Sequence, residues 1–136
     1  MTGWTLSSDA PPVNEAMRLR AVTGWGAPDA EVLRRALDGS DLHVVARDAE
    51  GALIGMARVV GDGALYFYVQ DVIVSESWRG RGVARAMVAD LVARVREEPG
   101  RCLGLLAVAG LEGFYESLGF QRRPDGRFGA GMMLFT

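Results

Sequence analysis

The stretch Trp78–Val88, with the sequence WRGRGVARAMV, is the part of this chain that decides its fold. A β-prone apolar run comes shortly before it and consists of Val72, Ile73 and Val74. The apolar residues of the following segment recur at every fourth position: Val83, Met87, Leu91 and Val95. This spacing places side chains on one face of a helix. The stretch therefore predicts a strand, a glycine-rich turn and a long helix in succession.

The predicted turn combines glycine with arginine. Gly80 and Gly82 lie between strand and helix, and the flanking arginines are Arg79, Arg81 and Arg85. Glycines let backbone amides approach an anion, and the free N–H groups and dipole of a helix start favour negative charge. Arginines add charge-assisted hydrogen bonds. We interpret the turn as a site for a phosphorylated cofactor; an ordinary strand-to-helix turn is the alternative.

Two other glycine-rich phosphate loops are excluded by the letters. A Walker A loop ends in Gly-Lys-Ser or Gly-Lys-Thr, and this chain contains no lysine. A dinucleotide-binding fingerprint needs a third glycine where Arg85 stands.

Two segments resemble one known family. Arg79, Gly82 and Ala84 match the coenzyme A signature [QR]-x-x-G-x-[GA] of the GNAT superfamily of acyl-CoA-dependent N-acyltransferases. Downstream, Phe114–Phe120, with the sequence FYESLGF, resembles the F-Y-x-x-x-G-F segment that closes the same fold. The chain looks most like small bacterial and plastid arylalkylamine-type acetyltransferases from about Gly24 onward. The stretches that carry this closer likeness are Gly24-Trp25, Ala36-Leu37 with Ser40, Leu53–Arg58 and Asp71-Val72.

The composition indicates an ordinary soluble domain. The chain has 136 residues, of which 49% are hydrophobic and 24% charged, with a formal net charge of −2. This length suits a single domain. We expect no membrane span, no nucleic-acid surface and a cytoplasmic location, with a homodimer left open. The single cysteine, Cys102, excludes an internal disulfide and fits a reducing compartment.

The order of expected elements predicts a mixed α/β (α+β) fold with an antiparallel meander, a crossover helix and splayed parallel strands. A short strand at Trp4–Leu6 precedes a helix that Asn14 caps and that runs to Gly24, and a second helix begins at Pro28-Asp29 and ends at Gly39. The expected meander strands are Leu42–Arg47, Ala52–Val60 and Leu65–Val74. After the long helix we expect a strand at Leu103–Val108, a helix at Leu111–Leu118, and strands near Phe120–Arg122 and Met132–Phe135.

The resemblance implies acetyl-CoA as co-substrate and no metal. Backbone groups of Val72, Ile73 and Val74 would pair with the pantetheine arm, and one N–H would polarise the acetyl carbonyl. The residues that the resemblance places around the rest of the cofactor are Arg79, Gly80, Arg81, Gly82, Val83, Ala84, Arg85 and Phe114. Independently, the sequence has no His/Cys/Asp/Glu cluster at metal-ligand spacing.

The resemblance also assigns a proton donor. Tyr115 matches the tyrosine that serves as general acid in the family, and a phenol keeps its proton at neutral pH and can pass it to a forming thiolate. A packing role beside Phe114 is the alternative. Family members often place His or Glu at the positions of Tyr68 and Gln70, and this sequence has neither. We therefore predict that Tyr68 and Gln70 order a water that removes the proton of the amine.

The acceptor side rests on few residues. Asp71 is the nearest carboxylate and could attract a cationic amine, but strand alternation directs it away from Gln70 unless a bulge intervenes, and a structural role is the preferred interpretation. Trp25 either walls the acceptor pocket or fills the core. We expect a structural or solvent-facing His43 and a buried, unreactive Cys102. The predicted acceptor is a small primary amine; a protein N-terminus or lysine, and a non-catalytic acyl-CoA sensor, remain as alternatives.

Overall fold

A five-stranded sheet with helices on both faces forms the molecule. The computed structural model describes residues 3–136. The strands are β1 (Trp4–Ser7), β2 (Leu42–Asp48), β3 (Leu53–Gly61), β4 (Tyr66–Val74) and β5 (Cys102–Gly104), and they lie in this order across the sheet. The helices are α1 (Val13–Arg20), α2 (Ala30–Asp38), the short 3-10 helix η1 (Glu76–Trp78), α3 (Val83–Val95) and α4 (Glu112–Glu116). Neighbouring strands from β1 to β4 are antiparallel and β4 pairs with β5 in parallel, which confirms the predicted meander and crossover.

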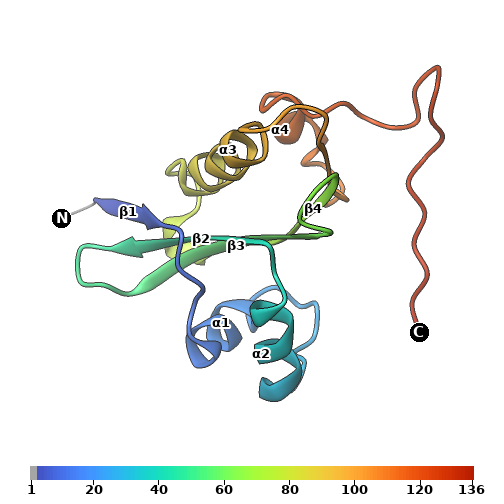
Figure 1. Cartoon of the computed structure of the whole chain (residues 1–136). Coiled ribbons are helices and arrows are strands. Elements are labelled where there is room, and N and C mark those ends of the chain that lie inside the picture. The colour runs from blue at the N-terminus through green and yellow to red at the C-terminus, as the bar shows by residue number, and fades with distance from the viewer. Residues whose placement is uncertain (1–2) are drawn as a thin grey trace.

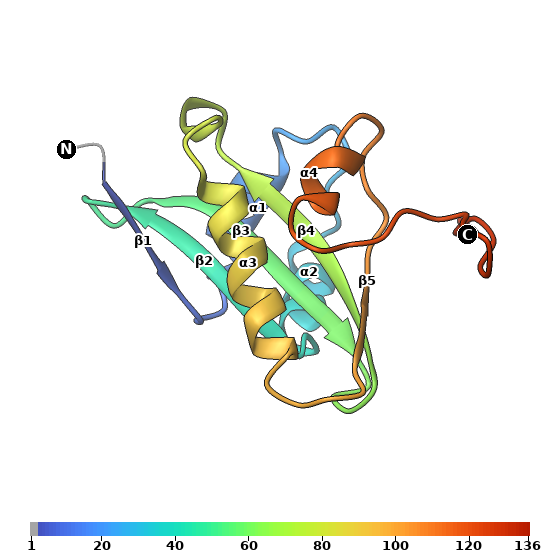
Figure 2. The same cartoon turned by 90° about the horizontal axis from the view of Figure 1, so that it is seen from above.

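The helices divide the core into two layers. Figure 1 shows α3 on one face of the sheet and α1 with α2 on the other, and Figure 2 shows α3 lying along the central strands. The apolar stripe of α3 that the four-residue spacing predicted is buried against the sheet. A separate cluster lies between the sheet and the N-terminal helices and contains Ala16, Leu19, Leu33, Leu37, Val45, Met56 and Ile73.

A local signal accounts for the start of α2 but not for the start of α1. The prediction that Asn14 caps the first helix is wrong, because α1 begins at Val13 after Pro12 and Asn14 lies inside it. The Asp29 carboxylate accepts a hydrogen bond from the Val32 N–H at 2.9 Å, which caps α2 as its sequence indicates. The predicted length of the first helix is wrong, because α1 ends at Arg20 rather than at Gly24. Both the N–H and the hydroxyl of Thr23 donate to the carbonyl of Arg20, at 3.1 and 2.8 Å, and this turn breaks the helical pattern. The residues that follow become an exposed loop containing Trp25.

A β-bulge lies in the middle of β4. Asp71 and Val72 together face the single residue Ala57 of β3, because the flanking pairs are Met56–Ile73 and Arg58–Gln70. Asp71 has a φ of 55°, in the left-handed region that residues other than glycine seldom adopt. An extra residue reverses the alternation of side chains beyond it. The bulge that the sequence analysis left as a condition is therefore present, and it places Asp71 on the same side of the sheet as α1.

β4 and β5 separate soon after they meet. Their pairing covers only Tyr66–Tyr68 and Cys102–Gly104, and the predicted strand at Leu103–Val108 ends as a strand at Gly104. Beyond Tyr68 the outer edge of β4 has no strand partner among the described residues. The separation opens the sheet on the side toward α4 (Figure 2) and confirms the predicted splayed parallel strands.

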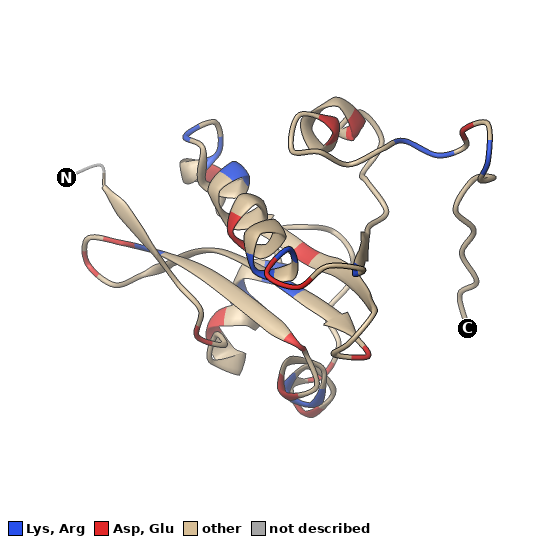
Figure 3. Ribbon diagram, turned by 45° about the horizontal axis from the view of Figure 1, so that its top comes forward, with Lys and Arg blue, Asp and Glu red and all other residues tan. Residues whose placement is uncertain are grey.

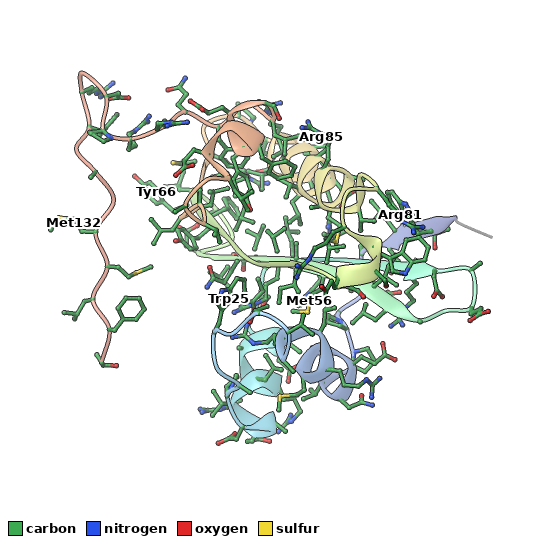
Figure 4. All side chains as sticks on the ribbon, turned by 180° about the vertical axis from the view of Figure 1, so that it is seen from behind. Trp25, Met56, Tyr66, Arg81, Arg85 and Met132 are labelled. Atoms are coloured by element: carbon green, nitrogen blue, oxygen red, sulfur yellow. The ribbon has the colours of Figure 1, made fainter. Side chains whose placement is uncertain are left out.

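The two C-terminal strands predicted from sequence are wrong. Residues 121–136 contain no strand, and the side chains of Met132, Leu134 and Phe135 are 93%, 86% and 87% exposed. This segment extends away from the sheet (Figures 1 and 4). Strand propensity has effect only where an edge is within hydrogen-bonding reach. Glycines at positions 126, 129 and 131 further weaken the segment as a strand.

Candidate functional site

A groove with a volume of about 1020 Å³ occupies the opening between β4 and the chain that follows β5. This volume is at the upper end of the range of about 300–1,000 Å³ that is typical of small-molecule sites. Residues from five parts of the chain line it: Val22, Thr23 and Trp25; Tyr68–Val74; Trp78, Arg79, Gly80 and Gly82–Arg85; Leu105–Val108; and Leu111, Phe114 and Tyr115. Met133 of the C-terminal segment also lines it. The groove thus brings together the predicted site residues except Arg81.

The start of α3 presents a set of unpartnered amides. The first hydrogen bond of the helix joins the Ala86 N–H to the Gly82 carbonyl at 3.0 Å. The N–H groups that precede it, from Gly82 to Arg85, have no acceptor in the part of the chain that the structure describes. Gly82 offers no side-chain cap and the first turn of α3 carries no acidic residue. These donors and the helix dipole are available to an anion.

Glycine is required at two positions of this turn. Gly80 and Gly82 have φ of 74° and 83°, and a Cβ on either would meet no atom within 4 Å. Backbone conformation, rather than steric conflict with a neighbouring residue, therefore selects glycine here. The open space lets an anion approach the backbone closely.

The three arginines of the turn have different partners. Arg79 Nε lies 3.3 Å from the Val74 carbonyl oxygen, and the Arg81 guanidinium stacks 4.8 Å above the Trp78 ring. In Figure 4, Arg81 lies at the turn before α3 and Arg85 lies nearer to α4. Figure 3 shows basic residues at the start of α3. Arg85 reaches α4 instead of the turn. Its guanidinium donates to Ser117 Oγ at 2.9 Å and lies 5.3 Å from the Phe114 ring.

Tyr115 lies at the centre of an aromatic cluster beside the groove. Its ring makes edge-to-face contacts with Phe114 and Phe120, at centroid distances of 5.0 and 5.9 Å. Burial raises the pKa of the Tyr115 phenol, so the hydroxyl retains its proton well above neutral pH. The same ring packs and lines the groove, and a packing role and a proton-donating role are therefore compatible.

Two further polar side chains of β4 line the groove. Tyr68 is half-buried, and burial raises the pKa of its phenol, with a backbone contact at Leu106 acting in the opposite direction. A phenol with a raised pKa is a poor proton acceptor at neutral pH. Gln70 is exposed and faces Arg58 across the strand pair. Their positions are consistent with holding a water rather than with direct base catalysis.

Asp71 is engaged by arginine on both oxygens. Arg20 Nη1 lies 2.5 Å from Oδ1 and Arg58 Nε lies 2.8 Å from Oδ2, while the Asp71 side chain is 2% exposed. A buried carboxylate is stable only when it is paired. The geometry favours the structural interpretation of Asp71 over a contact with the amine. Trp25 is 50% exposed and lines the groove, so it does not fill the core.

The remaining candidates lie outside the groove. His43 Nε2 is 2.9 Å from the Leu37 carbonyl oxygen, and burial lowers the pKa of its imidazole, as suits a structural histidine. The expected burial of Cys102 is wrong: its side chain is exposed. It begins β5, the last strand of the sheet, and within the described part of the chain no further strand covers that edge. Among residues 3–136 no group of acidic, histidine and cysteine side chains is arranged to hold a metal.

Sequence reasoning missed two features of the site. It predicted Arg85 as a cofactor ligand but not its contacts with α4, and it gave no role to Arg20 or Arg58. No pattern along the chain links Arg20 to Asp71, which are 51 positions apart. Only the apposition of α1 with the bulge in β4 reveals the pair.

Comparison with known proteins identifies the class that this fold and groove define. A family model for the acetyltransferase (GNAT) domain matches residues 15–136. Serotonin N-acetyltransferase 2, chloroplastic, of Oryza sativa subsp. japonica is 36% identical over 120 residues, which cover 86% of this chain. The chain belongs to the GNAT acetyltransferase family. The matched part spans 58% of the length of the rice relative.

Solved structures show the same fold. A probable acetyltransferase from meticillin-resistant Staphylococcus aureus matches with a TM-score of 0.85 at 23% identity, covering 98% of this chain and 100% of that one. A GNAT family acetyltransferase from Brucella melitensis, determined in complex with acetyl-CoA, matches with a TM-score of 0.70 at 20% identity, covering 90% and 85%. The fold that the two sequence motifs predicted is confirmed. In residues 3–136, no helix has the length and apolar character needed to cross a membrane.

Proposed function

We propose that this protein is an N-acetyltransferase that uses acetyl-CoA and acts on a small primary amine. The observation that carries the proposal is the set of unpartnered amides at Gly82–Arg85, in the wall of a groove that also holds Tyr115. The pyrophosphate of coenzyme A fits the amides of Gly80, Gly82, Val83 and Ala84. Arg79 and Arg81 add positive charge at the rim, and Arg85 with Phe114 borders the groove.

The free edge of β4 supports the position of the pantetheine arm. Val72, Ile73 and Val74 lie on a part of the β4 edge that β5 leaves unpaired. An extended amide-containing arm pairs with such an edge as an added strand would. A backbone N–H beside the bulge then lies where it can polarise the acetyl carbonyl. The thioester, when bound, supplies an activated acetyl group, and the protein supplies its position.

The chemistry is a direct transfer. The amine nitrogen forms a bond to the acetyl carbon, the carbon–sulfur bond breaks, and Tyr115 gives its proton to the departing sulfur. The raised pKa of Tyr115 keeps that proton available at neutral pH. A water held by Tyr68 and Gln70 accepts the proton that the amine loses. No side chain becomes acylated.

The acceptor proposal rests on Trp25 and on the named activity of a relative. Trp25 presents an aromatic surface to the groove (Figure 4). The rice relative bears the name of an enzyme that acetylates an arylalkylamine. An aryl or alkyl amine is therefore the acceptor class that we propose, with the cytoplasm as the location. That relative is described as chloroplastic, so a plastid-type setting is the competing location.

A screen of amines tests the acceptor class. With acetyl-CoA present, we expect thiol release with small primary aryl- or alkylamines and much less with basic peptides. The screen should include amino acids, polyamines, aminoglycosides and peptides with a free N-terminus. Preference for peptides would replace the small-amine proposal with a protein acetyltransferase. Binding of coenzyme A without thiol release from any amine would identify a non-catalytic sensor.

Replacement of Cys102 by alanine should leave kcat within about twofold of the wild-type value, because direct transfer uses no acyl-enzyme and surface substitutions have small effects. This test is informative because Cys102 is exposed and its thiol is therefore accessible to an acylating group. Steady-state thiol release measures the outcome, and Cys102→Ser serves as a second variant. Loss of turnover in both variants, with folding retained by circular dichroism, would require an acyl-enzyme scheme.

A further inference from the structure

The bulge of β4 is held by an arrangement that we call the Asp71 clamp, formed by Asp71, Arg20 and Arg58. Asp71 adopts a φ of 55°, a conformation that persists in a non-glycine residue only when surrounding contacts enforce it. Both carboxylate oxygens are ion-paired, and the side chains of Arg20 and Arg58 are 14% and 12% exposed. These charges come from three separate elements, α1, β3 and β4. The clamp therefore joins an N-terminal helix to strands β3 and β4.

The clamp continues toward the loop that carries Trp25. The carbonyl of Arg20 accepts from the Thr23 hydroxyl at 2.8 Å, and Thr23 Oγ1 in turn accepts from the Trp25 N–H at 3.1 Å. Thr23 and Trp25 both line the groove. Each link is a hydrogen bond of ordinary length. The guanidinium that fixes Asp71 thus belongs to the residue whose carbonyl anchors residues 21–27, the segment with Trp25 that we call the acceptor loop.

A second connection leads from the clamp to the end of α2. Arg58 Nη1 donates to Ser40 Oγ at 3.2 Å, and the Ser40 hydroxyl donates to the Ala36 carbonyl at 2.8 Å. The two helices that cover this face of the sheet are accordingly both tied to the bulge (Figure 1). Trp25 and Met56 lie on this same side of the sheet (Figure 4).

The other side of the bulge faces the cofactor. Val72 follows Asp71 directly and begins the edge along which the pantetheine arm is proposed to lie. Gln70 directly precedes Asp71 and also lines the groove. A shift of the bulge would therefore move the acetyl-binding edge of β4 relative to the acceptor loop. In transfer reactions, a misplacement of about 1 Å can lower the rate about 100-fold.

We propose that the Asp71 clamp is a positioning device that sets the acceptor loop against the acetyl-binding edge of β4. Asp71 is a positioning residue in this scheme, because both of its oxygens are occupied by arginine. The proposal rests on the proposed acetyl transfer for its kinetic consequences. Its structural consequence, an acceptor loop held through Arg20, does not depend on catalysis.

Substitutions at Asp71 separate charge from backbone conformation. Asn accepts a positive φ and nearly preserves the shape of Asp while removing the charge. For Asp71→Asn we expect kcat/KM for the acceptor to fall at least tenfold, within the roughly 100-fold range of a misplaced reacting group. The Kd for coenzyme A should change much less than kcat/KM, since the pyrophosphate contacts at the amides of α3 are untouched. Arg20→Met should behave similarly, and Arg20→Lys should recover part of the activity by restoring one ion pair.

The matched control is Glu15→Gln. Glu15 of α1 pairs with Arg47 of β2 at 2.9 Å and so also ties α1 to the sheet, but it does not touch the bulge. We expect wild-type kinetics from this variant. Equal losses in Glu15→Gln and Asp71→Asn would show that general attachment of α1 is responsible, and would overturn the proposal. Should Asp71→Asn fail to fold, Arg20→Met and Arg20→Lys carry the same comparison.

Hydrogen exchange supplies a readout that is independent of turnover. In Asp71→Asn or Arg20→Met, backbone amides of residues 21–27 should exchange faster, while those of α3 should be unchanged. If the loop exchanged at the wild-type rate in these variants, the clamp would be overturned even if the variants had lost activity. Conversely, the wild-type protein could acetylate no amine while the variants still show faster loop exchange. That result would refute the proposed reaction but would support the clamp.

Discussion

Replacement of Tyr115 by phenylalanine is expected to lower kcat by about 10²–10⁴-fold, the range typical for loss of a general acid. The ring contacts with Phe114 and Phe120 do not involve the hydroxyl, so folding and coenzyme A binding should survive. Tyr66→Phe is the matched control. Tyr66 begins β4, a strand that lines the groove, but Tyr66 itself is 66% exposed and lies outside the groove. Thiol release under chemistry-limited conditions measures the effect.

The pH profile provides a second test of Tyr115. Burial raises the pKa of its phenol, so the protonated, active form persists to higher pH and activity falls only as pH rises through that raised value. This basic limb should be absent from Tyr115→Phe. The acidic limb, which reports loss of the proton from the amine, should remain. A wild-type rate for the variant would make Tyr115 a packing residue and show that the thiolate leaves without an enzymic proton.

Replacement of Gly82 by valine is expected to weaken coenzyme A binding by about 100-fold or more. A hydrogen bond to a charged group contributes about 1.5–3 kcal/mol, and each 1.4 kcal/mol corresponds to about tenfold in Kd, so loss of two such bonds accounts for this change. The Cβ of the new residue would stand in open space within the groove, where the anion must approach the amides. Isothermal titration calorimetry with coenzyme A measures the affinity.

The control for Gly82→Val is Gly100→Val. Gly100 has a φ of 82°, nearly that of Gly82, and its Cβ would also meet nothing within 4 Å, but it lies outside the groove. Both variants carry the same backbone strain, of about 1–3 kcal/mol. Both should therefore lose similar thermal stability, and only Gly82→Val should lose affinity. Equal affinities in the two variants would place the pyrophosphate elsewhere.

Features encoded by neighbouring residues were predictable from the sequence. The spacing of Val83, Met87, Leu91 and Val95 predicted α3 and its buried face, and Asp29 marked the start of α2. The arrangement of Gly80, Gly82 and the surrounding arginines predicted an exposed helix start. These predictions hold because helix phase, capping and positive φ depend on contacts within a few positions of the chain. The family motifs then predicted the sheet order through a known fold.

Features that depend on distant contacts were not predictable in the same way. The exposure of Cys102 follows from the position of β5 at the sheet edge. Residues 132–135 have the composition of a strand, but they pair with no edge of the sheet. Periodicity along a chain identifies a segment that can form a strand but not the strand that will pair with it.

The sequence by itself determined the class of the fold and the glycine-rich start of α3, and it singled out the turn as the proposed phosphate site and Tyr115 as the candidate acid. Only the tertiary structure decided where the meander is interrupted and what holds the interruption in place. Asp71 looks like any carboxylate near a strand until Arg20 and Arg58 are brought to it from α1 and β3. A buried charge takes its role from its partners, and those partners are chosen by the packing of the whole domain rather than by the residues beside it in sequence.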